Sequence, residues 1–166
     1  MKLRATPENI VTADILRATT TRVDWQRNAT GRVQLPSGLW IRYGLGGILG
    51  TADWIGTVRV TGRIFALEVK APGEKPDLER VDKAIRANSY CPDSCQHALC
   101  HVVHQELYLR RVRSAGGLGI FADCVADVDR ALAEDQARLV EWIRFRLGAS
   151  TDPAVEALLR RLPNAA

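Results

Sequence analysis

The sequence predicts an α/β fold in which a mixed central sheet is flanked by helices. Residues 50–70, GTADWIGTVRVTGRIFALEVK, have the pattern of two strands joined by a tight turn. The second strand is apolar on both sides until its last residues, which is typical of a central strand buried on both faces. Helical patterns precede and follow these strands. At 166 residues the chain is long enough for a sizeable core, and we expect one domain over residues 1–150 followed by a tail over 151–166.

The amino-terminal part begins with a predicted helix over about residues 7–20. Thr6 can accept a hydrogen bond from the first turn, and Pro7 fits that turn because its missing N–H is not needed there. The glycines before residue 51 do not form a dinucleotide-binding motif, since Leu49 occupies the third glycine position and no helix follows. Short strands are expected between the helix and these glycines, with apolar positions at Val23, Trp25, Leu39, Trp40, Ile41 and Tyr43.

The carboxy-terminal part alternates between predicted helices and one predicted strand. The apolar stretch LGIFAD, residues 118–123, reads as a short buried strand after the helix stop at Ala115-Gly116-Gly117. The helices are expected over about residues 77–87, from residue 93 or 94 to about 113, over 124–147, and over part of 152–162.

The composition gives limited information about partners. No apolar run reaches membrane length and the amino terminus lacks a signal-peptide pattern, so we expect no membrane association and a cytoplasmic location. The formal net charge is +4, and the cations are mostly arginine, which suits bidentate contacts with phosphate. Abundant arginine can also reflect genome composition, so it is only mild support for a nucleic-acid partner. The 4 cysteines are not expected to form structural disulfides in the cytoplasm.

Charged residues at the end of the apolar strand form the main candidate for a catalytic site. Glu68 and Lys70 share one face of that strand, and Asp53 opens the preceding strand. Such groups are costly to bury without a partner, and a divalent cation such as Mg²⁺ or Mn²⁺ prefers carboxylate oxygens. An Asp…Glu-x-Lys pattern is typical of metal-dependent phosphodiester hydrolysis. The alternative is that Glu68 and Lys70 form an exposed surface pair.

The order of elements and several local motifs resemble the VRR-NUC family (virus-type replication-repair nucleases) of the PD-(D/E)XK nucleases. The similarity covers about residues 7–135. The motifs that carry it are Arg27-Asn28 followed by Gly31, Arg42-Tyr43-Gly44 leading to Gly50-Thr51-Ala52-Asp53, Glu68-Val69-Lys70-Ala71-Pro72-Gly73 followed by Lys75-Pro76, and Gln105 before Ala115-Gly116-Gly117.

The resemblance implies a restriction-endonuclease-like core and a Mg²⁺- or Mn²⁺-dependent nuclease. It also implies that Lys70 is catalytic and that Gln105 points at the site. The residues themselves favour a core-facing Gln105, because it shares a helical stripe with apolar neighbours, although a core-edge glutamine bonded to backbone is the alternative. The metal ligands implied by the resemblance are Asp53, Glu68, the Val69 carbonyl and Glu8; the alternative role of Glu8 is interaction with the helix dipole.

The resemblance further implies a DNA endonuclease acting on branched or structured DNA, such as a Holliday junction or flap, in replication, repair or recombination. A homodimer is expected because paired cuts need paired sites. Arg27, Arg32 and Arg42 precede the Asp53 strand and are candidates for phosphate contacts, or are simply solvated arginines. The alternatives are a non-catalytic DNA-binding module on the same fold, a restriction-type or tRNA-acting nuclease, and a zinc-dependent regulatory protein.

The chain departs from the family pattern by an insertion at about residues 80–104, which we expect to be a Cys/His-rich helical insertion. The insertion contains all 3 histidines and 3 of the 4 cysteines of the chain. A structural zinc could be bound by thiolates and imidazole, and residues four apart on a helix share a face. Alternatively, the cysteines pack as small apolar residues and the histidines face water or DNA, or His101 lies near the active site. The preferred zinc ligands are Cys91, Cys95, Cys100 and His104, with His97 or His101 as replacements.

Overall fold

A computed structural model describes residues 6–28, 31–34, 40–43, 50–91, 97–147, 152–155 and 157, with the backbone alone for 31–34 and 40–43. Its first element is helix α1, Pro7–Thr19. The Thr6 hydroxyl accepts a hydrogen bond from the Asn9 N–H at 3.3 Å, and Pro7 occupies the first turn. The expected amino-terminal helix and its capping residue are therefore confirmed.

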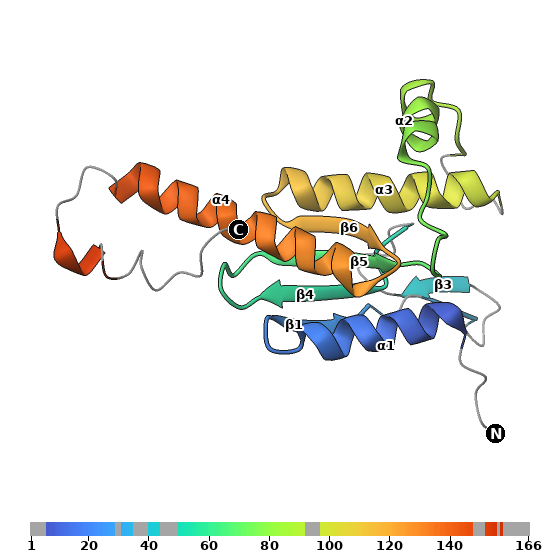
Figure 1. Cartoon of the computed structure of the whole chain (residues 1–166). Helices are drawn as coiled ribbons and strands as arrows, with labels where there is room; N and C mark the ends of the chain where they lie inside the picture. Colours follow the sequence, from blue (N-terminus) through green and yellow to red (C-terminus); the bar gives the residue numbers. More distant parts are fainter. Residues whose placement is uncertain are drawn as a thin grey trace.

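A mixed four-stranded sheet forms the centre of the fold, in the order β1-β4-β5-β6 (Figure 1). Strand β5 pairs antiparallel with β4 on one side and parallel with β6 on the other, so it is a central strand as expected. The expected hairpin is the β4–β5 pair, and β1 adds antiparallel to β4. These strands span Val23–Arg27 (β1), Trp54–Val58 (β4), Ile64–Val69 (β5) and Leu118–Ala122 (β6).

A separate two-stranded antiparallel sheet is formed by β2, Gly31–Gln34, and β3, Trp40–Tyr43. The expected strand positions from Trp40 to Tyr43 are confirmed at the level of the backbone, whereas Leu39 lies outside the described residues. The pairing places the Cα atoms of Arg32 and Arg42 directly opposite each other.

Helices cover both faces of the four-stranded sheet (Figure 1). Residues of α1 and α4 pack with Phe65, Leu67 and Val69 in one hydrophobic cluster. On the other face, Ala66 packs against Leu109 of α3, and α2 packs against α3. Side chains alternate along a strand, so Glu68 falls on the α3 side together with Ala66. The helices span Leu78–Arg86 (α2), Ala98–Ser114 (α3) and Val125–Leu147 (α4).

One helix boundary differs from the sequence prediction. Helix α3 begins at Ala98, not at residue 93 or 94, because His97 has an extended backbone (φ −71°, ψ 124°) and makes no side-chain capping bond. Residues 92–96 lie outside the described part. In the tail, residues 153–155 and 157 are helical, and the rest of the predicted 152–162 helix lies mainly outside the described residues.

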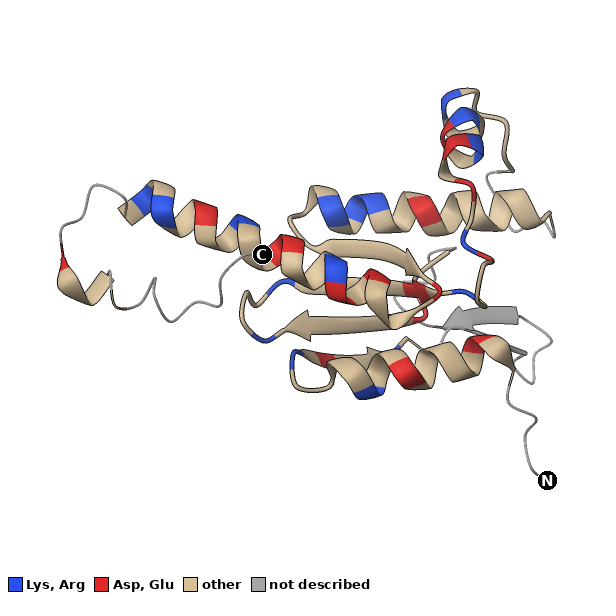
Figure 2. Cartoon of the chain, in the orientation of Figure 1, with Lys and Arg blue, Asp and Glu red and all other residues tan. Residues whose placement is uncertain are grey.

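Charged side chains are concentrated on the helices and loops, while the strands of the central sheet are largely uncharged (Figure 2). Lysine and arginine gather in the last turns of α3 and α4, where they interact favourably with the negative ends of the helix dipoles. Within the described residues, no helix is long and apolar enough to span a membrane.

Candidate active site

The carboxylates of Asp53 and Glu68 meet at the carboxyl end of β5. Trp54 pairs with Leu67 in the antiparallel β4–β5 ladder, so Asp53, one residue before Trp54, lies beside Glu68. The Asp53 Oδ2 atom accepts a hydrogen bond from the Val69 N–H at 3.1 Å. The backbone of β5 therefore fixes the Asp53 carboxylate across the end of the strand.

Glu68 is a buried carboxylate with unequal oxygens. Its residue surface is only 2% exposed. Oε1 accepts hydrogen bonds from Lys70 Nζ at 2.9 Å and from the Gln105 amide, whereas Oε2 is buried and has no hydrogen-bond partner in the described structure. Burial and the negative charge of Asp53 raise the pKa of Glu68 to about 7, although Lys70 and the backbone N–H of Asp53 act in the opposite direction. The ionised form therefore needs more positive charge than Lys70 supplies.

Gln105 joins helix α3 to the charged end of β5. It is 4% exposed, and its Oε1 accepts a hydrogen bond from Lys70 Nζ at 3.2 Å while its Nε2 donates to Glu68. Lys70 Nζ also lies 5.7 Å from the centre of the Phe121 ring, a favourable cation–π distance. The core-facing placement expected for Gln105 is confirmed, and its amide bridges Lys70 and Glu68.

Two residues hold the segment before Asp53 in place. Gly50 has a φ of +72°, and a Cβ at this position would overlap the backbone of His104 and Gln105, so only glycine fits between the loop and α3. Asn28 donates from Nδ2 to the Ala52 carbonyl at 2.8 Å and from its N–H to the Asp53 carbonyl at 2.9 Å. The sequence drew attention to both positions, but the contact of Gly50 with α3 and the bonds of Asn28 are visible only in the fold.

Other predicted site residues are less closely associated with this group. The Glu8 side chain is exposed at the start of α1, and no hydrogen bond or ion pair joins its carboxylate to the described site residues. The Val69 carbonyl follows Glu68 on the same strand end. Arg27 is exposed at the end of β1, whereas the side chains of Arg32 and Arg42 lie outside the described structure.

The predicted zinc ligands do not converge within the described residues. The Cys91 N–H donates to Cys100 Sγ at 3.5 Å, and His104 Nε2 is bonded to the Cys91 carbonyl at 2.8 Å. Cys95 lies outside the described part. Among the described histidine, cysteine and acidic residues, the group close enough to share an ion is Asp123, Cys124 and Asp127. The zinc site therefore remains a prediction.

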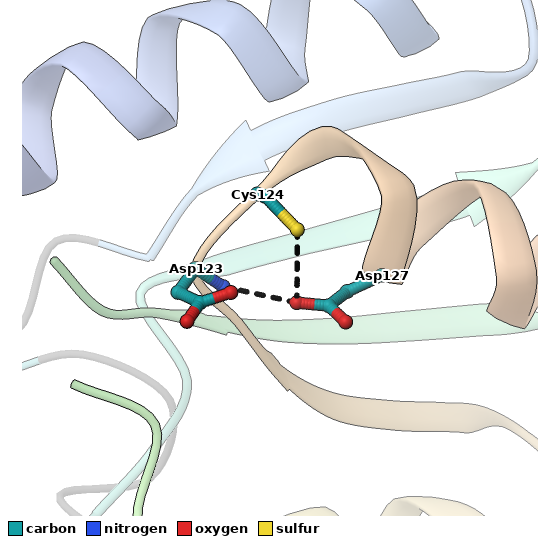
Figure 3. A group of neighbouring side chains, drawn as sticks. All are labelled: Asp123, Cys124 and Asp127. Atoms are coloured by element: carbon teal, nitrogen blue, oxygen red, sulfur yellow. Dashed lines mark hydrogen bonds between the residues drawn. The ribbon is translucent and has the colours of Figure 1, made fainter. Parts of the chain in front are cut away.

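The Asp123–Cys124–Asp127 group lies just after the end of β6, and Asp127 accepts hydrogen bonds from the Asp123 N–H and from Cys124 Sγ (Figure 3). The ammonium of Lys75 already occupies this group: its Nζ lies 2.9 Å from both Asp127 oxygens and 3.4 Å from Asp123. Burial opposes ionisation of Asp127, yet the bonds from Lys75 and the Asp123 N–H lower its pKa. An ion pair of this kind explains the cluster without a metal.

The same cluster ties down the loop that follows Lys70. Besides Lys75, the Gly73 N–H donates to Asp123 Oδ2 at 3.0 Å, and the Lys70 N–H donates to the Ala122 carbonyl at 2.8 Å. Sequence reasoning missed this role of Lys75, because its partners lie about fifty residues further along the chain.

Comparisons of the chain with protein-family models, with curated proteins and with solved structures find no match.

Proposed function

We propose that this protein is a nuclease of the PD-(D/E)XK type, with a resemblance to the VRR-NUC family, that hydrolyses DNA with Mg²⁺ or Mn²⁺. The observation that carries the proposal is the arrangement at the end of β5. A buried Glu68, one oxygen of which has no hydrogen-bond partner within the described part of the chain, lies beside Asp53, and Lys70 and Gln105 complete the group. A surface ion pair, the alternative weighed from the sequence, does not agree with a glutamate that is 2% exposed.

The residues present fit a hard divalent cation. Both carboxylates offer oxygen ligands, which Mg²⁺ and Mn²⁺ prefer over nitrogen or sulfur. The unpartnered Glu68 Oε2 and the raised pKa of Glu68 both indicate missing positive charge at this point. Asp53 and Glu68 would hold the ion, with the Val69 carbonyl and Glu8 as further ligands implied by the family resemblance. When bound, the ion would activate water and stabilise charge on the phosphate.

The remaining roles belong to the side chains of the chain itself. Lys70 would orient the attacking water, or help deprotonate it once the lysine has lost its own proton, and its ammonium form would stabilise the charge that develops on the phosphate. Its ammonium is restrained by Glu68 and Gln105 at 2.9 and 3.2 Å, so little reorganisation is needed. Gln105 therefore acts on the reaction by restraining Lys70 and Glu68.

Branched or structured DNA is the proposed substrate, by resemblance to the family, and replication, repair or recombination is the proposed setting. Arg27, Arg32 and Arg42 remain candidates for phosphate contacts. If they act, affinity should fall with rising salt, with a slope set by the number of phosphates contacted. A homodimer in the cytoplasm is part of the same proposal.

The test is a cleavage assay with single-stranded, duplex, flap and four-way DNA, and with RNA, in the presence of Mg²⁺ or Mn²⁺. Glu68→Ala and Lys70→Ala should each lower the rate by roughly a hundredfold or more, as for loss of an electrostatic stabiliser. Glu79→Gln, which alters an exposed carboxylate on α2, is the matched control and should cleave like the wild type.

The other possible outcomes either contradict the assignment of Glu68 and Lys70 or favour a different function. Full activity in both purified variants would overturn the assignment of Glu68 and Lys70. Tight DNA binding without cleavage of any substrate would favour a non-catalytic DNA-binding module. Preferential cleavage of RNA would favour a tRNA-acting nuclease on the same fold.

A further inference from the structure

His101 lies one helical turn before Gln105 on α3, and the two side chains are in contact. The Nε2 atom of His101 is 3.1 Å from Nε2 of Gln105. The His101 side chain is only partly exposed to solvent, whereas Gln105 is buried. The imidazole therefore lies on the solvent side of the Gln105 amide, at the edge of the proposed active site.

The partners of Gln105 determine which way its amide points. Lys70 carries an ammonium, which can only donate hydrogen bonds, so the Gln105 atom 3.2 Å from its Nζ must be the oxygen. The amide nitrogen then faces Glu68 and His101. The reversed amide would place NH₂ against the ammonium and oxygen against the carboxylate, which is unfavourable on both sides.

The amide nitrogen of Gln105 has two hydrogens, and each has one partner. One hydrogen is directed to Glu68 Oε1 and the other to His101 Nε2. The His101 nitrogen must therefore be an acceptor, which places the ring proton of a neutral imidazole on Nδ1.

The surroundings of His101 favour this neutral form. Burial and the ammonium of Lys70 lower the pKa of His101, and His104 on the same helix lowers it further, while Asp53 has the opposite effect. A protonated ring would direct a second donor at the NH₂ group of Gln105. The observed contact is therefore compatible with a neutral His101 and not with a protonated one.

We propose that His101 is a positioning residue that accepts the second amide hydrogen of Gln105 and so holds the amide with its oxygen on Lys70 and its nitrogen on Glu68. The hydrogen bond is a property of the folded chain. Its consequence for cleavage rests on the proposed nuclease function, where loss of such a supporting contact typically lowers activity by about tenfold or more.

The decisive variants are His101→Ala, which removes the acceptor, and His101→Gln, whose amide oxygen can replace it. Arg111→Ala is the matched control, because Arg111 is exposed near the far end of the same helix. The first readout is nuclear magnetic resonance of uniformly ¹⁵N-labelled full-length protein. It reports the protonation of each His101 nitrogen and the Gln105 side-chain NH₂ signals, which are assigned by their loss in Gln105→Met.

The proposal expects a neutral His101 protonated on Nδ1 at pH 7.5. It expects the Gln105 NH₂ signals to shift or broaden in His101→Ala, to return towards their original positions in His101→Gln, and to stay unchanged in Arg111→Ala. A proton on Nε2 of His101, or Gln105 signals that are identical in His101→Ala and the wild type, would overturn it. These results do not depend on whether the protein cleaves DNA.

The second readout is the pH profile of DNA cleavage. His101→Ala should lower kcat about tenfold. His101→Gln should restore kcat, and its profile should keep only the acid-side loss caused by protonation of Glu68, whose pKa is about 7. A kcat unchanged in His101→Ala would show that positioning by His101 has no effect on the reaction. If the wild type cleaves nothing, the nuclease proposal fails while the resonance experiment still decides the hydrogen bond.

Discussion

Two lysine–carboxylate groups lie at neighbouring strand ends, and they differ in how completely the carboxylate is satisfied. After β6, both oxygens of Asp127 lie 2.9 Å from Lys75 Nζ, and Asp127 also accepts the Asp123 N–H. At the end of β5, Lys70 and Gln105 both bind Oε1 of Glu68, and Oε2 has no hydrogen-bond partner among the residues that the structure describes. The pKa of Asp127 is lowered, whereas that of Glu68 is raised to about 7.

This difference separates a structural ion pair from a candidate active site. The Lys75–Asp127 pair is complete and fastens a loop to the start of α4. The Lys70–Glu68 pair is incomplete, and burial without full compensation is expected only where another group supplies the missing charge. The two groups should therefore respond differently to pH, to loss of the lysine and to added metal.

The largest expected effect is on the pH dependence of stability. The pKa of Glu68 rises from 4.5 to about 7 on folding, so its stabilising contribution is fully present below pH 4.5 and is lost as the pH rises through about 7. This shift corresponds to about 3 kcal/mol of unfolding free energy. Urea unfolding at pH 5 and pH 8, with a chelator present, should show this loss in the wild type and not in Glu68→Gln.

Parallel pH dependences in the wild type and Glu68→Gln would contradict the buried, incompletely paired state of Glu68. Asp127→Asn provides the contrast, since the pKa of Asp127 is lowered. Its ionised form contributes stability above the unfolded value of 3.8 that is lost at more acidic pH, so Asp127→Asn should leave the difference between pH 5 and pH 8 intact.

The second-largest expected effect is the loss of stability at constant pH when either lysine is removed. Lys75→Met should lower the free energy of unfolding by about 2 kcal/mol, because it leaves the buried Asp127 carboxylate without its main partner; this figure is reduced because Lys75 is half-exposed. Lys70→Met should cost less at pH 6, where Glu68 can take up a proton instead. Urea unfolding measures both, with Lys83→Met on the exposed side of α2 as control. If Lys70→Met and Lys75→Met lowered the free energy of unfolding equally, the contrast between an incomplete and a complete ion pair would be contradicted.

The smallest effect concerns added metal. At ten times the dissociation constant, Mg²⁺ should stabilise the wild type by about 1.4 kcal/mol, as for any ligand that binds only the folded state. Thermal unfolding with and without Mg²⁺ should show this gain in Asp127→Asn but not in Glu68→Gln. A gain that disappears in Asp127→Asn instead would place the metal at the Asp123–Cys124–Asp127 group.

The sequence predicted the parts of this structure that depend on local patterns. The short run from Ile64 to Val69, apolar on both faces until its last residues, predicted the central strand, and Thr6 with Pro7 predicted the start of α1. Adjacent placement of Asp53 and Glu68 followed from the hairpin, whose two strands are joined by a short turn.

The remaining features depend on contacts between distant parts of the chain. The Lys75–Asp127 pair joins residues 52 positions apart, and nothing in either local sequence specifies the other. The glycines before Asp53 are typical of a loop whose backbone approaches another group closely, but the sequence does not reveal that the neighbour of Gly50 is the backbone of α3. Helix α3 begins later than the sequence predicts because the backbone at His97 is extended, a property that composition does not reveal.

The order of the site residues along the chain has a consequence for folding kinetics. Asp53, Glu68 and Lys70 come from one hairpin, and hairpins form in about 1–10 μs because their contacts are local. Gln105 comes from α3, and the parallel pairing of β5 with β6 requires a crossover connection that contains α2 and α3. Such non-local pairings are slow steps. We therefore expect the acidic pair to form early and the amide that bridges Lys70 and Glu68 to be added in a later phase of folding.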